Sequence, residues 1–151
     1  MVYAIIVRNK VRNTFEQINL GNYAAMVAGL SDEFEYVFRG EHALGGRRVT
    51  KEAMNRWWER TLSVLPGAKF DVQEVLVNGG PWKTRIAVRS LVSGPLPDGE
   101  RYENTVFQFM TLTWGKVTAV ETVEDLQILE RALKKVADAG NPEAAAPPIN
   151  G

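Results

Sequence analysis

The chain has 151 residues, of which 45% are apolar and 24% charged, a composition typical of one folded domain and not of a disordered or fibrous protein. Eighteen basic and eighteen acidic side chains cancel, so charge gives no reason to expect binding to nucleic acid or to an anionic membrane surface. The sequence contains no Cys, and His42 is its single histidine, so we expect neither a zinc-finger site nor a multi-histidine metal centre, and no motif indicates a carboxylate-only metal site.

The first seven residues are apolar but too short for the core of a signal peptide, and no basic residue precedes them. No stretch approaches the roughly twenty apolar residues that a membrane helix needs. We therefore expect a soluble, cytoplasmic protein that has no membrane partner.

In the first half of the chain, apolar residues recur every three or four positions in three segments, which predicts three helices. The first extends to about residue 18 and ends at Gly21, the second covers residues 22–30, and the third begins at Thr50 and stops at Pro66. Residues 33–39 alternate between two faces and predict a strand, which a loop over residues 40–49 follows.

The second half predicts four strands, over residues 69–77, 82–92, 101–113 and 117–123, and a last helix over residues 124–139. Short, glycine-rich connections between these strands favour an antiparallel meander. The grouping of strands predicts an α+β domain over residues 1–140, with helices packed on one face of a curved antiparallel sheet. The Ala/Pro-rich tail, residues 141–151, is expected to add little to the core.

This order of elements resembles the nuclear transport factor 2-like superfamily, and within it the SnoaL-like group of polyketide cyclases, ketosteroid isomerases and limonene epoxide hydrolases. The resemblance also rests on the Gly-Glu-His-Ala-Leu-Gly-Gly loop at 40–46, on Trp-Trp-Glu-Arg at 57–60, on Gly-Gly-Pro-Trp-Lys-Thr at 79–84, on Trp-Gly-Lys at 114–116, and on Asp125. It implies a cone-shaped sheet around an apolar pocket, a small hydrophobic ligand and a homodimer.

This chain lacks the catalytic residues that two activities of the group require. The epoxide hydrolases use an Arg-x-Asp pair on a strand, and neither 85–91 nor 102–111 contains one. The isomerases carry their base aspartate late in the first strand, where this chain has Tyr-Val-Phe-Arg-Gly at 36–40. Neither mechanism is therefore carried over to this sequence.

His42 and Asp125 are the candidate catalytic residues. His42 lies in a glycine-flanked loop and has an ordinary pKa near neutrality, so it could act as a base or as a donor to an enolate; its alternative is a hydrogen-bonding or surface residue. The resemblance places a pocket carboxylate near Asp125, where apolar walls would raise the pKa. The alternative for Asp125, which follows Glu124, is to complement the dipole of the last helix.

The candidate ligand-binding residues come from the strands and from the aromatic side chains. Gln108 and Asn104 share a strand face with apolar neighbours and could orient a ligand oxygen. The alternatives are that this face lies on the other side of the sheet, or that Gln108 bonds another side chain. Glu121 could also point into the pocket, but the alternation of side chains along its strand does not show which face of the sheet it lies on. Aromatic residues pack in a protein core more often than they line a ligand pocket. The candidates for lining the pocket are Tyr23, Trp57 and Trp82.

Two hypotheses of function follow from these residues and from the resemblance. The first is a cofactor-independent cyclase or isomerase that moves a proton next to a carbonyl of an apolar substrate. The second is a non-catalytic small-ligand-binding or dimeric scaffold module of the same fold. A third, a protein-interaction adaptor similar to the transport factor, needs a protein partner on the sheet or loop surface, which the neutral charge and the scattered Arg residues neither support nor exclude.

Overall fold

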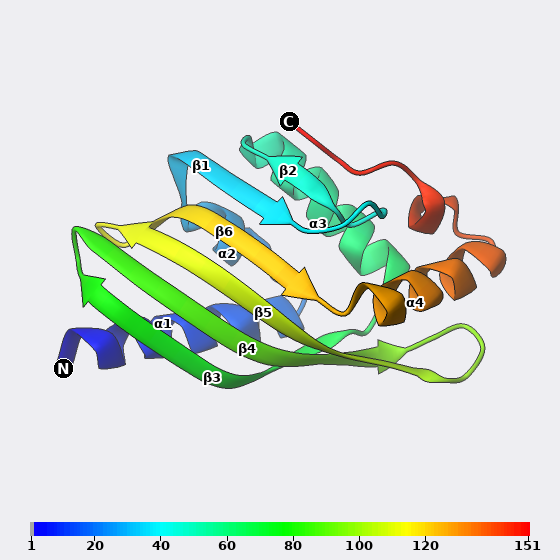
Figure 1. The fold of residues 1–151 in the computed structure, drawn as a ribbon, viewed down its shortest axis with the longest axis horizontal. Helices are drawn as coiled ribbons and strands as arrows, with labels where there is room; N and C mark the ends of the chain where they lie inside the picture. Colours follow the sequence, from blue (N-terminus) through cyan, green and yellow to red (C-terminus); the bar gives the residue numbers. More distant parts are fainter. Residues whose placement is uncertain (1) are drawn as a thin grey trace.

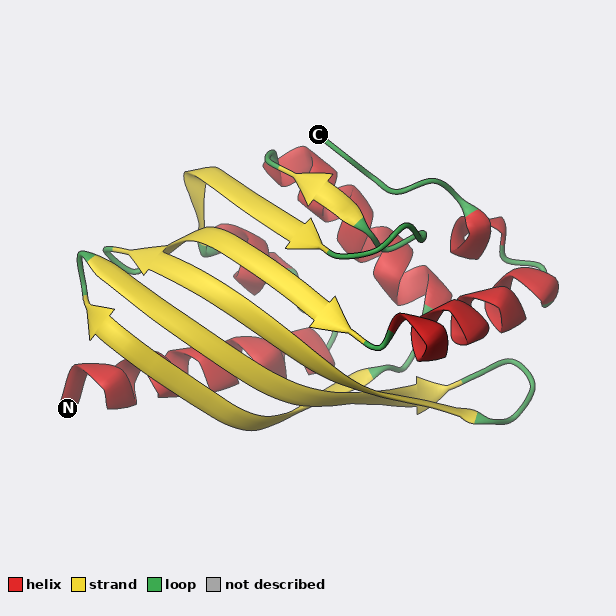
Figure 2. Cartoon of the chain, in the orientation of Figure 1, coloured by secondary structure: helices red, strands yellow, loops and turns green. Residues whose placement is uncertain are grey.

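The computed structural model describes residues 2–151 as a six-stranded sheet that curves around helices (Figures 1 and 2). The strands lie in the order β2-β1-β6-β5-β4-β3. The elements in chain order are α1 (Val2–Asn19), α2 (Ala24–Ala28), β1 (Leu30–Phe38), β2 (Gly46–Arg48), α3 (Lys51–Val64), β3 (Lys69–Gly80), β4 (Lys83–Pro95), β5 (Arg101–Thr113), β6 (Lys116–Glu124), α4 (Leu126–Asp138) and the short 3₁₀ helix η1 (Pro142–Ala145). The predicted α+β fold is confirmed.

Strands β3 to β6 form the predicted antiparallel meander. The tight turn between β3 and β4 requires a glycine at position 79. Gly79 has φ +95°, and a Cβ there would lie 2.3 Å from the carbonyl oxygen of Lys83. Only glycine, which has no Cβ, can adopt this positive φ with the Lys83 carbonyl oxygen so close. The right-handed twist of these long strands accumulates across the sheet, which curves around the helices.

Two features of the sheet differ from the sequence-based prediction. Strand β1 pairs in parallel with β6, so the sheet is mixed. The loop expected over residues 40–49 contains the short edge strand β2, which pairs antiparallel with β1. A strand of three residues is too short to show alternation, and parallel pairing between distant segments leaves no local pattern in the sequence.

The helices cover the concave face of the sheet, as Figure 1 shows for α1, α2 and α3. Helix α1 buries the predicted stripe of Val7, Val11, Phe15 and Ile18. The side chain of Thr50 accepts a hydrogen bond from the Ala53 amide, 3.2 Å away, and so starts α3. The core therefore lies between α1, α3 and the inner side of the sheet.

The tail packs against the body of the domain, contrary to the expectation that it adds little to the core. Ala144 is buried, and Arg48 Nη1 donates to the carbonyl of Ile149 at 2.7 Å. Arg60 Nη1 donates to the carbonyl of Pro147 at 2.7 Å, and the Arg47 amide donates to Asn150 Oδ1 at 2.8 Å. Polar backbone groups, which composition does not reveal, fix the tail in place.

No helix within residues 2–151 has the length and hydrophobicity of a membrane-spanning segment.

Candidate functional site

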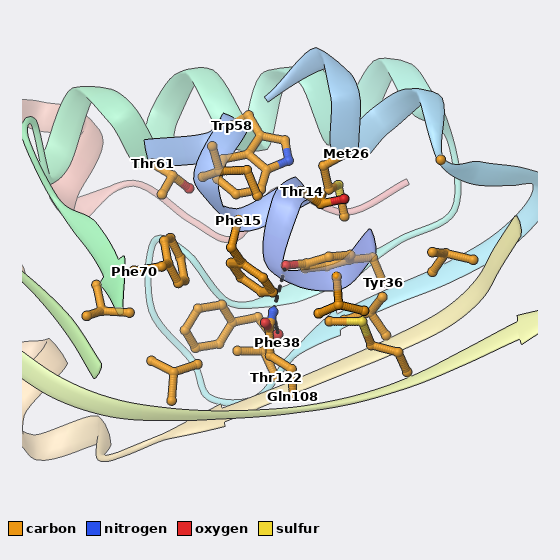
Figure 3. Close-up of a pocket in the computed structure, with 18 of the residues that line it drawn as sticks. Thr14, Phe15, Met26, Tyr36, Phe38, Trp58, Thr61, Phe70, Gln108 and Thr122 are labelled. Atoms are coloured by element: carbon orange, nitrogen blue, oxygen red, sulfur yellow. Dashed lines mark hydrogen bonds between the residues drawn. The ribbon is translucent and has the colours of Figure 1, made fainter. Parts of the chain in front are cut away.

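An apolar cavity of about 160 Å³ lies between the concave face of the sheet and helices α1, α2 and α3 (Figure 3). Its walls are mostly aromatic and aliphatic, with Phe15, Phe38, Trp57, Trp58, Phe70 and Val106 among them. A few polar side chains interrupt this lining. Cavities of this kind bind ligands through apolar contact, while the polar groups orient them.

The first polar cluster consists of Gln108, Tyr36 and Thr122. Gln108 and Thr122 are directly opposite each other on β5 and β6, and Figure 3 shows both pointing into the pocket toward the Tyr36 hydroxyl. Gln108 Nε2 donates to Thr122 Oγ1 at 3.1 Å and to the Tyr36 hydroxyl at 3.4 Å. Gln108 Oε1 is buried and has no hydrogen-bond partner among residues 2–151, so it is an acceptor available to a ligand donor.

The second cluster consists of Glu124, Tyr102 and Asn104. Glu124 lies two residues after Thr122 on β6, so both side chains are on the concave face. The Tyr102 hydroxyl donates to Glu124 Oε1 at 3.1 Å, and Asn104 Nδ2 donates to the Tyr102 oxygen at 3.0 Å. Asn104 also donates to the carbonyl of Asp125 at 3.0 Å, which fixes the amide in this orientation.

Burial controls the protonation of this second cluster. Desolvation raises the pKa of Glu124 to about 7; the negative charge of Asp125 acts in the same direction, and the hydrogen bond from Tyr102 opposes it. Desolvation and the neighbouring Glu124 also raise the pKa of Tyr102, which keeps its hydroxyl protonated as a donor. A cavity carboxyl with a pKa near neutrality can accept or release a proton under ordinary conditions.

His42 lies outside the cavity, in a surface groove beside α4 and residues 144–148. Its Nε2 lies 3.0 Å from the carbonyl oxygen of Arg39, and its Nδ1 accepts from the Leu44 amide at 3.2 Å. These contacts assign the neutral tautomer with the proton on Nε2. Burial lowers the pKa of His42, and its ring packs edge-on against Phe38. These contacts match the hydrogen-bonding alternative; the catalytic role stays a prediction.

Asp125 is the N-cap of α4. Its Oδ1 accepts hydrogen bonds from the amides of Gln127 at 3.0 Å and Ile128 at 3.4 Å, and the residue is exposed. This position fits the alternative in which the carboxylate stabilises the start of the helix. Its catalytic role also stays a prediction.

The structure brings two of the six candidate ligand-binding residues, Trp57 and Gln108, to the cavity wall. Asn104 is buried one hydrogen bond away from the cavity residue Tyr102. The other three lie elsewhere: Tyr23 stacks on Trp58 at 5.9 Å between ring centroids, Trp82 is 66% exposed in the β3–β4 turn, and Glu121 pairs with Arg39 at 2.7 Å on the convex face.

The sequence analysis missed Glu124, Tyr102, Tyr36 and Thr122 as site residues. Glu124 was assigned to the last helix, but β6 continues through it. Extending the alternation of β6 by one residue places Glu124 on the face of Thr122, and this signal could have identified it. Within the described part of the chain, no three His, Cys, Asp or Glu residues are grouped so that they could hold a metal ion.

Comparison with known proteins gives the family. The sequence profile described as "SnoaL-like domain" matches residues 11–120. A search of curated proteins found no match.

Solved structures share the fold at low sequence identity. Bal32a, from a soil-derived mobile gene cassette, superposes with a TM-score of 0.71 and 16% identity over 83% of this chain and 94% of its own. TerC, co-crystallised with polyporic acid, gives a TM-score of 0.70 and 16% identity over 83% and 96%. IdmH from Streptomyces antibioticus, a candidate polyketide cyclase, gives 0.68 and 16% over 86% and 97%. By its sequence match over most of its length and by its fold, the chain belongs to the SnoaL-like domain family.

Proposed function

We propose that the protein binds an apolar, enolisable carbonyl compound in the cavity and transfers a proton next to the carbonyl, with Glu124 as the base. The observation that carries this proposal is a carboxyl with a pKa of about 7 on the wall of an apolar cavity, held by the Tyr102 hydroxyl. Perturbed carboxyls in apolar cavities are typical of general acid–base sites.

In the proposed reaction, ionised Glu124 takes a proton from the carbon beside the ligand carbonyl. The electron pair of that C–H bond forms a carbon–carbon double bond, and the carbonyl oxygen becomes an enolate. A hydroxyl donor, from Tyr36 or Thr122, stabilises this oxygen, while Gln108 holds both hydroxyls in place. If the enolate is conjugated with a second carbon–carbon double bond, return of the proton from Glu124 to the far carbon of that system gives an isomerisation. Attack of the enolate carbon on a second carbonyl, whose oxygen then takes the proton from Glu124, gives a cyclisation.

The test is hydrogen–deuterium exchange into an enolisable apolar ketone, with 2-tetralone as the first probe, followed by NMR in D₂O. We expect Glu124→Gln to lower the enzyme-dependent exchange rate by about a hundredfold or more, in the range of a lost general base. In the wild type, the rate should rise with pH up to about pH 7, because only ionised Glu124 accepts a proton. Exchange that persists unchanged in Glu124→Gln would refute the role of Glu124.

Glu103→Gln is the matched control, because Glu103 is an exposed carboxylate on the neighbouring strand β5. It removes the same charge without altering the cavity. The same assay on His42→Ala and Asp125→Asn tests the catalytic roles predicted from the sequence. Saturable ligand binding without exchange in the wild type would favour the alternative, a non-catalytic binding module.

A homodimer and a cytoplasmic location stay proposals. Phe107 and Phe109, which are 45% and 52% exposed on the convex face of β5, support an apolar contact surface for a second copy. Sedimentation equilibrium of the wild type and of a Phe107→Ser/Phe109→Ser variant tests it. A dimer that the double variant retains would place the interface elsewhere.

A further inference from the structure

Arg48 is a buried cation, and no carboxylate within residues 2–151 pairs with it. Its side chain is fully buried on β2, directly opposite Tyr36 of β1. Nη1 donates to the carbonyls of Gly45 at 2.9 Å and Ile149 at 2.7 Å. Nε and Nη2 are buried and have no partner anywhere in residues 2–151. Neutral carbonyls satisfy part of the guanidinium but do not cancel its charge.

The positive charge lies instead against two aromatic rings of the cavity wall. The guanidinium carbon is 5.6 Å from the ring centroid of Tyr36 and 5.1 Å from that of Trp57. Both rings line the cavity, and Arg48 itself stands behind them. Desolvation lowers the pKa of Arg48 to about 10, so the group remains cationic at neutral pH.

Tyr36 lies between the charge of Arg48 and the cavity, because its ring contacts the guanidinium and also lines the cavity. Its hydroxyl accepts a hydrogen bond from Gln108 Nε2. Burial raises the pKa of Tyr36, while the hydrogen bond with Thr122 and the charge of Arg48 oppose this rise. The hydroxyl therefore stays protonated and can donate to a ligand in place of Thr122. A positive charge beside a phenol makes that O–H a stronger donor, and the effect is large where water is excluded.

We propose that Arg48 is a positioning residue that acts through Tyr36 and makes the cavity prefer a ligand oxyanion over its neutral form. This inference rests on the proposed function and narrows its substrate class: the ligand is an apolar compound with one ionisable oxygen, an enol or a phenol, seated against the Tyr36 hydroxyl.

Other charged groups near this site determine how the test must be designed. Arg60 and His42 lie near Arg48, and Glu130 lies near His42. Glu124, Tyr102 and Lys10 line the cavity, and the exposed Lys10 donates to the carbonyl of Gly115. Glu124 titrates near neutrality and would obscure a ligand titration, so the measurement uses the Glu124→Gln background.

The experiment measures the ionisation of bound 4-nitrophenol, whose phenolate absorbs visible light. In the Glu124→Gln protein we expect the bound probe to ionise at lower pH than the free probe. Adding Arg48→Met should reduce the preference for phenolate over phenol by about tenfold, a change of about one pH unit in the midpoint. Arg48→Lys, which keeps a positive charge, should retain part of the preference for phenolate over phenol. Arg47→Met is the matched control, since Arg47 is exposed and pairs with Glu35 at 2.6 Å.

Damage to the cavity alone would weaken phenol and phenolate equally and leave their ratio unchanged, and this result would overturn the proposal. Tyr36→Phe keeps Arg48 and removes the hydroxyl, so an unchanged ratio in that variant would overturn it even if Arg48→Met fails to fold. Absence of saturable binding of either form by the folded protein would overturn it as well. The readout is independent of turnover, so loss of the catalytic role of Glu124 in the exchange assay would leave this result standing.

Discussion

Glu124 should make the folded protein less stable as the pH rises, and Glu124→Gln should remove this dependence. Burial raises the pKa of Glu124 from its ordinary value of 4.5 to about 7. Between these two pH values, the folded protein keeps a proton on Glu124 that the unfolded chain has released. The folded state then binds more protons than the unfolded state, so the free energy of unfolding falls with rising pH.

The slope expected from one such group is about 1.4 kcal/mol per pH unit. Over the interval from pH 4.5 to about 7 the loss sums to at most about 3 kcal/mol. Below this interval Glu124 is protonated in both states, and above it the carboxylate is ionised in both, so the loss is complete. Gln has nearly the shape of protonated Glu and can accept the hydrogen bond from Tyr102.

Urea denaturation of wild type and Glu124→Gln at pH 4, 6 and 8, followed by tryptophan fluorescence, measures this effect. The two proteins should have similar stability at pH 4, and the variant should be more stable by up to about 3 kcal/mol at pH 8. Taking the difference between the two proteins cancels the other titrating groups, and Glu103→Gln should follow the wild type at every pH. A difference that does not change with pH would refute the raised pKa, and with it the argument for Glu124 as the base.

Three further substitutions test the assignments of neighbouring residues. His42→Ala should lower the free energy of unfolding by about 1–3 kcal/mol, because the Leu44 amide and the Arg39 carbonyl lose their hydrogen-bond partner. Because His42 lies outside the cavity, we expect turnover by the folded variant to be unchanged. A tenfold loss of turnover would instead support the predicted catalytic role. Asp125→Ala should cost about 1 kcal/mol and Asp125→Asn almost nothing, since Asn caps a helix as well as Asp does; equal losses in thermal or urea denaturation would argue against the cap. Val106→Phe should fill part of the cavity and raise the ligand dissociation constant by about tenfold or more, with a loss of stability no greater than the roughly 1–3 kcal/mol of an overpacked core position; titration calorimetry that gives wild-type affinity would place the ligand elsewhere.

The sequence predicted the elements with strong periodicity and missed those fixed by long-range pairing. The stripe of α1 and the meander from β3 to β6 follow from spacing alone, because each residue's face depends on its near neighbours. Strand β2 and the parallel pairing of β1 with β6 depend on segments far apart in the chain, which leave no local signal.

The candidate site was predicted in part for the same reason. Alternation along β5 grouped Gln108 with Asn104 and Val106 on one strand face, but it did not indicate which face of the sheet lines the cavity; only the structure assigns that face. Glu124 was missed because its position at the end of a strand and before a helix fits two assignments. Arg48 gave no signal, since an arginine in a glycine-rich loop is usually solvent-exposed. Its burial results from the packing of the tail and of α3, which only the three-dimensional structure reveals.

The parallel contact between β1 and β6 also bears on the order in which the protein folds. Hairpins β3–β4, β4–β5 and β5–β6 join neighbouring segments, whereas Leu30 of β1 pairs with Val117 of β6 across most of the chain. Closing so long a loop is slow, so β1 should dock after the hairpins have formed. Tyr36 arrives with β1, while Gln108 and Thr122 are already in place on the meander. A ligand that needs all three should therefore bind only at the last step and slow unfolding rather than speed folding.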